Sequence, residues 1–180
     1  MDVNNYIEYY PHIMDADLCK KIINTDFDYK KSTYSTHIGE SSETKERVKM
    51  DEFWIRKDND FYDPVKECFE KVIEKYKKRF SDFSIQHTTD FRINCYSEGD
   101  FMSRHVDNIH HSHGQEWGYP QVSALLFLND DYSGGEFQVS NSYFETSEGA
   151  AIIFPSNFMF PHKVDTVTSG TRWSIVTWLM

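Results

Sequence analysis

Cysteine is scarce in this sequence, which contains only Cys19, Cys68 and Cys95 among its 180 residues. Their number is odd, and no spacing among them matches a disulfide framework or a thiolate zinc site. The cysteine content therefore favours a reducing compartment, and we expect a cytoplasmic protein.

The sequence also lacks the segments that direct a chain to a membrane. The first ten residues include Asp2 and Glu8 and show no basic region followed by an apolar run, so no signal peptide is predicted. No apolar stretch approaches the length that a bilayer-spanning helix requires. We therefore expect no membrane association.

Positive charge is in short supply as well. The 19 Lys and Arg residues stand against 29 Asp and Glu residues, which gives a formal net charge of −10. Such a surface repels phosphate backbones, so nucleic acid is not expected as a partner.

No internal repeat or low-complexity tract is present, and the length suits one domain. The oligomeric state stays open.

Aromatic residues, in contrast, make up 16% of the chain, which suits a β-rich interior. Two amphipathic helices are predicted first, one over 15–27 with Asp15 as its cap and one from the cap Asp63 to Phe80. The polar segment 29–46 predicts a long surface loop, and 48–55 predicts a strand. Short β-type runs then predict strands at 89–96, 101–107, 121–128, 135–139, 143–146, 150–154, 159–165 and 171–179.

This order of elements predicts a mainly β fold with flanking helices. Two helices followed by about eight strands favour a double-sheet, jelly-roll β-sandwich packed against N-terminal helices. We expect a single domain over 1–180, with helical support over about 12–80 and a β core over about 85–180.

The most informative short motif is His105-Val106-Asp107. Residues two apart on a strand point to the same side, so His105 and Asp107 can face one point in space. An imidazole and a carboxylate suit a divalent metal, and a second histidine would complete three ligands that leave three coordination positions open. An isolated tripeptide of this kind also occurs by chance, so the prediction depends on further residues.

The chain has eight histidines, and the seven besides His105 compete for the place of the third ligand. We predict His162, because it lies in a late, apolar, strand-like segment. A lone histidine on such a strand can equally be a hydrogen-bonded core residue. Three of the other histidines lie in the N-terminal half, namely His12, His37 and His87. The remaining three, His110, His111 and His113, lie in a loop directly after the first two ligands. They can form an adventitious surface metal site or simply a solvated loop.

Arg172 is the second unusual feature, because it stands in a run that otherwise reads as a buried strand. A guanidinium cannot lose its charge and is costly to bury alone. A bound dicarboxylate would accept its paired donors, and Ser174 on the same side could add a hydroxyl. The alternative is a salt bridge to an acid elsewhere in the chain.

The predicted strand at 89–96 carries a polar face formed by Arg92, Asn94 and Tyr96. Such a row suits a polar pocket if the face points inward, and needs no function if it points to solvent. We predict that Tyr96 lines the pocket and that Arg92 and Asn94 contact the substrate.

Together these residues resemble the prolyl 4-hydroxylase-like group of Fe(II)/2-oxoglutarate dioxygenases, over roughly 91–179. The stretches 104–108 and 171–178 are similar to the oxygen-sensing prolyl hydroxylases in particular. Six ordered elements carry the resemblance: Tyr96-x-x-Gly99, His105-x-Asp107, Leu128-Asn129-Asp130 with Gly134-Gly135-Glu136-Phe137, Ile153-Phe154-Pro155, Pro161-His162-x-Val164, and Arg172 to Trp178.

The resemblance implies a double-stranded β-helix core and an enzyme that hydroxylates an aliphatic C–H bond. Iron(II) would be held by the catalytic residues His105, Asp107 and His162. The co-substrate 2-oxoglutarate would be held by Arg172 and Tyr96, with O2 as oxidant and ascorbate as a further cofactor. Trp178 would line the pocket near the metal and contact the substrate.

One departure from the resemblance concerns Phe127, which stands where some relatives carry a second pocket tyrosine. Phenylalanine donates no hydrogen bond, so another donor is expected, either Ser174 or Thr177. The loop 108–120 and the loop 29–46 are expected to border the substrate entrance.

The sequence leaves three functions open. The first is hydroxylation of a prolyl residue in a peptide or protein. The second is the same chemistry on a free amino acid, another small molecule or an alkylated base, the last disfavoured by the acidic charge. The third is a non-catalytic β-sandwich module that keeps a metal site for structure. Open coordination positions and Arg172 argue against the module, because structural sites prefer closed coordination.

Overall fold

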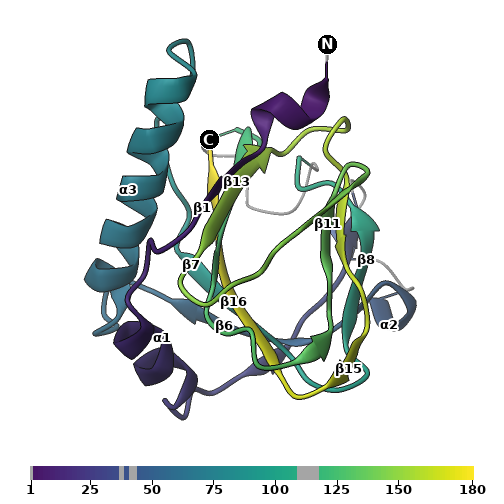
Figure 1. Ribbon diagram of the computed structural model, residues 1–180. Helices are drawn as coiled ribbons and strands as arrows, with labels where there is room; N and C mark the ends of the chain where they lie inside the picture. Colours follow the sequence, from purple (N-terminus) through teal and green to yellow (C-terminus); the bar gives the residue numbers. More distant parts are fainter. Residues whose placement is uncertain (1, 37–38, 41–43, 109–117) are drawn as a thin grey trace.

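Two antiparallel β-sheets face each other, and a helical layer covers the outer side of one of them (Figure 1). This computed structural model describes residues 2–36, 39–40, 44–108 and 118–180. The fold is a double-stranded β-helix, as the sequence predicts.

The larger sheet, here called the major sheet, has seven strands in the order β1-β13-β9-β16-β7-β6-β2. Its central strands β9 and β16 are buried along nearly their whole length, as expected for strands covered on both faces. The strands are β1 (Glu8–Tyr10), β2 (Lys30–Lys31), β6 (Asp51–Ile55), β7 (Phe91–Tyr96), β9 (Val122–Phe127), β13 (Ala151–Pro155) and β16 (Arg172–Leu179).

The minor sheet has five strands in the order β12-β11-β14-β8-β5. Its strands are β5 (Val48–Lys49), β8 (Phe101–His105), β11 (Phe137–Val139), β12 (Ser142–Phe144) and β14 (His162–Val164). Two short ladders lie outside both sheets and join β10 (Ser133–Gly134) to β15 (Val167–Ser169) and β3 (Ser35–Thr36) to β4 (Gly39–Glu40).

Two hydrophobic cores follow from this layering. The first fills the space between the sheets, where Phe127 and Phe154 of the major sheet meet Phe137 of the minor sheet. The second lies between the outer face of the major sheet and the helices, where Phe69 stacks on Phe91 with ring centroids 5.3 Å apart. The alternation of side chains along each strand supplies one face to each core.

The helical layer consists of α1 (Ala16–Ile23) and the long α3 (Tyr62–Arg79), which lies against the major sheet on the side away from β8 and β11 (Figure 1). The 3-10 helix η1 (Val3–Tyr6) precedes β1, and the short α2 (Thr44–Arg47) precedes β5. None of the described helices is long and apolar enough to cross a membrane.

Several predicted boundaries are wrong. Helix α1 ends at Ile23 rather than at 27, and the N-cap of α3 is Phe61, so Asp63 lies within its first turn. The predicted strand 159–165 is reduced to β14, because the turn closed by the Phe160 N–H on the Asn157 carbonyl precedes it. Segment 29–46 contains the short elements β2, β3, β4 and the start of α2, and strands β1, β2, β5 and β6 show that the chain before residue 80 also contributes to the sheets.

Candidate metal centre

Three side chains converge between the two sheets at one end of β8. His105 is the last residue of β8, and Asp107 follows it two residues later. His162 is the first residue of β14 and pairs with His105 across the ladder between the two strands. Nε2 of His105 lies 3.4 Å from Oδ1 of Asp107, and Nε2 of His162 lies 3.3 Å from Oδ2. One ligand atom from each residue lies within 4.8 Å of the other two.

The surroundings of these residues prepare both imidazoles to bind a cation. Nδ1 of His105 lies 2.8 Å from the Ser103 carbonyl oxygen, and Nδ1 of His162 lies 3.3 Å from that of Phe160. A carbonyl only accepts, so each Nδ1 carries the proton and each Nε2 presents its lone pair to the cluster. Burial, together with the neighbouring His162, lowers the pKa of His105 and favours the neutral ring.

The carboxylate of Asp107 is held in its charged form. Burial alone would raise the pKa of Asp107, but His162 and His105 hold it well below its ordinary value. The cluster therefore offers one anionic oxygen donor and two neutral nitrogen donors, which suits a divalent metal of intermediate softness.

Arg172 lies in the same cavity, on β16, with 1% of its surface exposed. Its Nη1 donates to Oγ of Ser174 over 3.1 Å, whereas Nε and Nη2 have no hydrogen-bond partner within the described part of the chain. Among the described residues no carboxylate forms an ion pair with it, so the predicted alternative of an internal salt bridge is not found. A buried guanidinium with free donors is a fitting receptor for a carboxylate.

Aromatic rings surround this guanidinium. Its carbon Cζ lies 5.4 Å from the ring centroid of Tyr96, 5.6 Å from that of Phe127 and 5.9 Å from that of Phe137. These rings keep water away from Arg172 and strengthen any charge-assisted hydrogen bond it makes. Gly135 permits this packing, because a Cβ there would lie 3.1 Å from Cδ of Arg172.

The alternation of β16 and β7 decides which predicted residues face the cavity. Trp178 and Ser174 line it with Arg172, and Arg92, Asn94 and Tyr96 line it from β7. The prediction that the polar face of β7 points inward is therefore in agreement with the structure. Thr177 points to the other face of β16 and donates to the Thr89 carbonyl over 3.0 Å, so it is not a donor to the cavity.

Arg92 lies toward the edge of the cavity in a polar and aromatic cluster. Its Nε donates to Oδ1 of Asn94 over 2.9 Å, and its Nη1 lies 3.4 Å from Oε2 of Glu52. Its guanidinium carbon lies 4.8 Å from the Trp178 ring centroid and 6.0 Å from that of Trp54. Sequence reasoning missed Glu52 and Trp54, although their alternation on the predicted strand 48–55 places them on one face.

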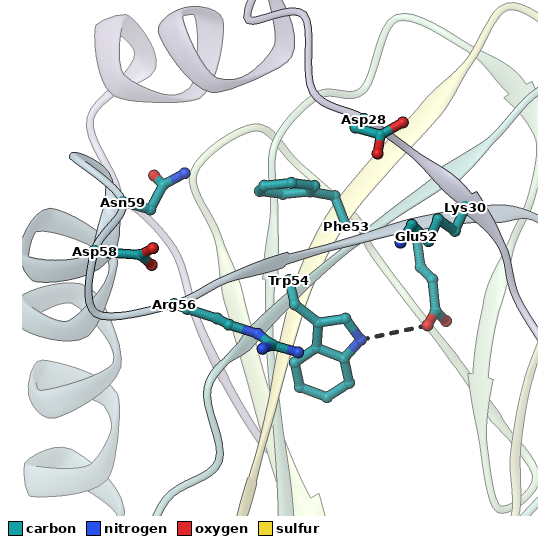
Figure 2. A pocket seen from close by; sticks show the side chains of 8 residues that line it. All are labelled: Asp28, Lys30, Glu52, Phe53, Trp54, Arg56, Asp58 and Asn59. Atoms are coloured by element: carbon teal, nitrogen blue, oxygen red, sulfur yellow. Dashed lines mark hydrogen bonds between the residues drawn. The ribbon is translucent and has the colours of Figure 1, made fainter.

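Figure 2 shows the residues of a groove that is lined by β6 and by the segments before and after it. Phe53 and Trp54 project to opposite sides of the strand, and the indole nitrogen of Trp54 donates to Oε1 of Glu52 over 3.3 Å. Glu52 and Trp54 thus belong both to the groove and to the surroundings of Arg92. The residues that line the groove are Asp28, Lys30, Glu52, Phe53, Trp54, Arg56, Asp58 and Asn59.

The predicted loop histidines His110, His111 and His113 lie outside the described residues. A further residue that the sequence analysis did not single out is Ser123, which donates to Asp107 from β9 over 2.6 Å. It is the one hydroxyl in the apolar run 122–128, and that isolation was its signal.

The residues present fit an iron ion and a small dicarboxylate. Two imidazoles and one carboxylate form the facial arrangement that leaves coordination positions open for oxygen chemistry. The unpartnered nitrogens of Arg172 lie in the same cavity and require an acceptor that the described protein does not supply.

The family model of the 2OG-Fe(II) oxygenase superfamily matches residues 91–180, half of the chain. The chain therefore belongs to this superfamily, whose name gives iron(II) and 2-oxoglutarate as its cofactors.

Curated relatives match about half of the chain. A PKHD-type hydroxylase of Psychrobacter sp. is 38% identical over an alignment of 95 positions, which covers 48% of this chain and 36% of that protein. A PKHD-type hydroxylase of Acaryochloris marina is 39% identical over an alignment of 90 positions, which covers 47% of this chain and 38% of that protein. The match thus spans well under half the length of these relatives.

Solved structures share the fold over nearly the whole chain. A prolyl-4-hydroxylase of Pseudomonas putida superposes with a TM-score of 0.73 at 17% identity, over 97% of this chain and 91% of that one. A prolyl hydroxylase of Trichoplax adhaerens, solved with a hypoxia inducible factor peptide fragment, has a TM-score of 0.76 at 17% identity, over 98% and 84%. At this identity the likeness establishes the fold.

Proposed function

We propose that this protein is an iron(II)- and 2-oxoglutarate-dependent dioxygenase that hydroxylates an aliphatic C–H bond, and that its substrate is a prolyl residue of a peptide or protein. The observation that carries the proposal is the placement of the partly unpartnered Arg172 in one cavity with His105, Asp107 and His162. We propose the whole chain as one such domain, and a cytoplasmic location, which the three buried free cysteines support.

In this proposal the chain binds and orients two groups. His105, Asp107 and His162 hold the iron, and Arg172 donates hydrogen bonds to the distal carboxylate of 2-oxoglutarate, supported by Ser174. When bound, iron and 2-oxoglutarate supply the oxidising chemistry with O2. The buried rings around Arg172 exclude water from the cavity.

Tyr96 has two roles in the proposal. It is 3% exposed and faces the guanidinium of Arg172 across the β7–β16 ladder, so its ring holds the cation in place. Burial raises the pKa of Tyr96, which keeps the phenol protonated and available as a donor to the co-substrate.

The substrate side of the cavity supports a peptide. Arg92 and Glu52 lie side by side and can pair with the carbonyl and N–H of a peptide backbone, while Asn94 fixes the orientation of Arg92. Trp54 and Trp178 offer aromatic faces on which a pyrrolidine ring can pack. The groove of Figure 2 gives the flanking residues of a peptide room to continue along β6.

The pair of Arg92 and Glu52 also favours one alternative substrate, a free amino acid. Its carboxylate and ammonium group match the charges of Arg92 and Glu52. The two substrates therefore differ in what they need from this end of the cavity, since a free amino acid makes no use of the groove along β6.

Succinate formation from 2-oxoglutarate, with Fe(II) and O2, tests the proposal. We expect a proline-containing peptide to accelerate succinate formation more than the matched alanine peptide and more than free proline. Free proline as the better substrate would favour the alternative. His105→Ala and Asp107→Ala should abolish turnover, and turnover that persists in both variants would refute the proposed metal site.

A further inference from the structure

Two serines adjoin the carboxylate of Asp107. Oγ of Ser123, on β9, donates to Oδ2 of Asp107 over 2.6 Å. Oγ of Ser156, directly after β13, lies 2.8 Å from Oγ of Ser123. Both serines are completely buried, so water does not compete for these hydrogen bonds.

The directions of the two hydrogen bonds follow from chemistry. A carboxylate only accepts, so the single hydroxyl proton of Ser123 points to Asp107. Ser123 must then accept from Ser156, whose own proton points to Ser123. The two hydroxyls therefore form a chain that ends on one oxygen of the carboxylate.

The backbone holds this chain in place. The Ser156 N–H donates to the Gln121 carbonyl over 2.8 Å, and the Ser156 carbonyl accepts from the Asn108 N–H over 3.1 Å. Ser156 is thereby tied both to the start of β9 and to the residue that follows Asp107. The backbone of β9, and the residues that follow β8 and β13, therefore fix where the two hydroxyls lie relative to the carboxylate of Asp107.

We infer that Ser123, supported by Ser156, is a positioning residue that fixes the orientation of the Asp107 carboxylate between the two histidines. This inference rests on the proposed function. An ion held by two histidines and one carboxylate would keep positions open for the co-substrate and oxygen only while the carboxylate keeps its orientation. Ser123 opposes rotation of the carboxylate through its hydrogen bond to Oδ2, which also lies 3.3 Å from Nε2 of His162.

Co(II) provides a probe for this role, because its absorption spectrum reports the ligands and does not depend on turnover. We expect Ser123→Ala to retain Co(II) binding while 2-oxoglutarate binds the Co(II)-loaded protein on the order of tenfold more weakly. Ser156→Ala should show a smaller loss. Ser123→Thr retains the hydroxyl and should restore the affinity for 2-oxoglutarate.

Ser32→Ala is the matched control, because Ser32 is also buried but its Oγ has no hydrogen-bond partner among the residues that the structure describes. It should bind Co(II) and 2-oxoglutarate like the wild type. Unchanged 2-oxoglutarate affinity in Ser123→Ala would overturn the inference, and so would a joint loss of Co(II) binding and thermal stability, which indicates a structural role. A wild-type protein that binds neither probe would instead refute the proposed function.

Discussion

At the scale of single residues, the site depends on charges that the protein leaves incompletely paired. Arg172 is fully buried, and its Nε and Nη2 find no acceptor among the described residues. Asp107 has the opposite situation, since two imidazoles and Ser123 surround its carboxylate. The cavity therefore has a cationic end at Arg172, whose donors are incompletely paired, and an anionic end at Asp107, whose carboxylate is surrounded by partners.

The buried guanidinium of Arg172 should lower the free energy of unfolding of the ligand-free protein. We expect Arg172→Met to raise the free energy of unfolding of the ligand-free protein by about 1–3 kcal/mol. The variant no longer buries two N–H donors that lack acceptors, so it avoids the free energy that their desolvation costs. The same variant should weaken 2-oxoglutarate binding roughly 100-fold, since a charge-assisted hydrogen-bonded pair contributes about 3 kcal/mol. Urea denaturation and calorimetric titration measure the two effects.

Arg172→Lys serves as the control for charge. Lysine keeps the cation but not the paired donors, so 2-oxoglutarate affinity should fall between those of the wild type and Arg172→Met. A ligand-free Arg172→Met protein that is less stable than the wild type would contradict this account of the arginine.

Residue patterns in the sequence identified most of the candidate site. The His-x-Asp spacing and the unexpected arginine in an apolar strand are local signals, and the structure brings His105, Asp107, His162 and Arg172 into one cavity. Ser123 and Glu52 carry only weak signals, an isolated hydroxyl in an apolar run and a place on an alternating strand. Their importance arises only from the pairing of β9 and β6 with other strands, which sequence spacing does not encode.

At the scale of elements, the helix α3 and the major sheet form the support on which β7 is fixed. Phe69 of α3 stacks on Phe91 of β7, and both are almost fully buried. The alternate residues of β7 then point to the other side and line the cavity. The helix therefore positions the cavity without contributing a side chain to it.

Removal of this contact tests the division of roles. We expect Phe69→Ala to lower the free energy of unfolding by about 3–5 kcal/mol, because it leaves a cavity in the core between helix and sheet. Urea denaturation measures this loss. Glu70→Ala, one position further along α3, should change stability by less than about 0.5 kcal/mol because Glu70 is exposed.

At temperatures where the Phe69→Ala protein is folded, its KM for 2-oxoglutarate should equal that of the wild type. A large rise in this KM would mean that α3 does more than support the sheet.

Element predictions succeeded where the apolar pattern was long and failed where tertiary contacts decide. The buried strands β7, β9, β13 and β16 lie close to their predicted ranges. The edge strand β1 was not predicted, because three residues of pairing with β13 leave no periodicity to detect. Helix α1 ends early although Phe27 continues its apolar stripe, because the chain turns after Ile23 and Phe27 packs on Phe53 instead.

At the scale of the whole molecule, the three cysteines belong to the interior. Cys19, Cys68 and Cys95 are free and buried. Burial raises the pKa of Cys19 and that of Cys95 to about 12. The folded protein therefore keeps these thiols protonated at a pH where the unfolded chain has released the protons.

This difference has a defined sign. Above a pH of about 9 the unfolded chain binds fewer protons than the folded protein, so the free energy of unfolding should fall as the pH rises. At pH 8 the folded protein should react with a thiol reagent far more slowly than the protein in urea. Rapid modification of all three cysteines in the folded protein would contradict their burial.

The charges that line the cavity differ from the net charge of the molecule. The net charge of −10 disfavours anionic macromolecules, whereas the cavity itself contains the cations Arg92 and Arg172. A small dianion such as 2-oxoglutarate is therefore bound by local charges that the molecule as a whole does not display.

The most direct measurement of the central claim is a calorimetric titration of the metal-free protein with Fe(II) under anaerobic conditions. The account predicts one ion per chain in the wild type, and no comparable binding in Asp107→Ala or His162→Ala, because each variant removes one of the three converging ligands. Wild-type stoichiometry and affinity retained in both variants would contradict it.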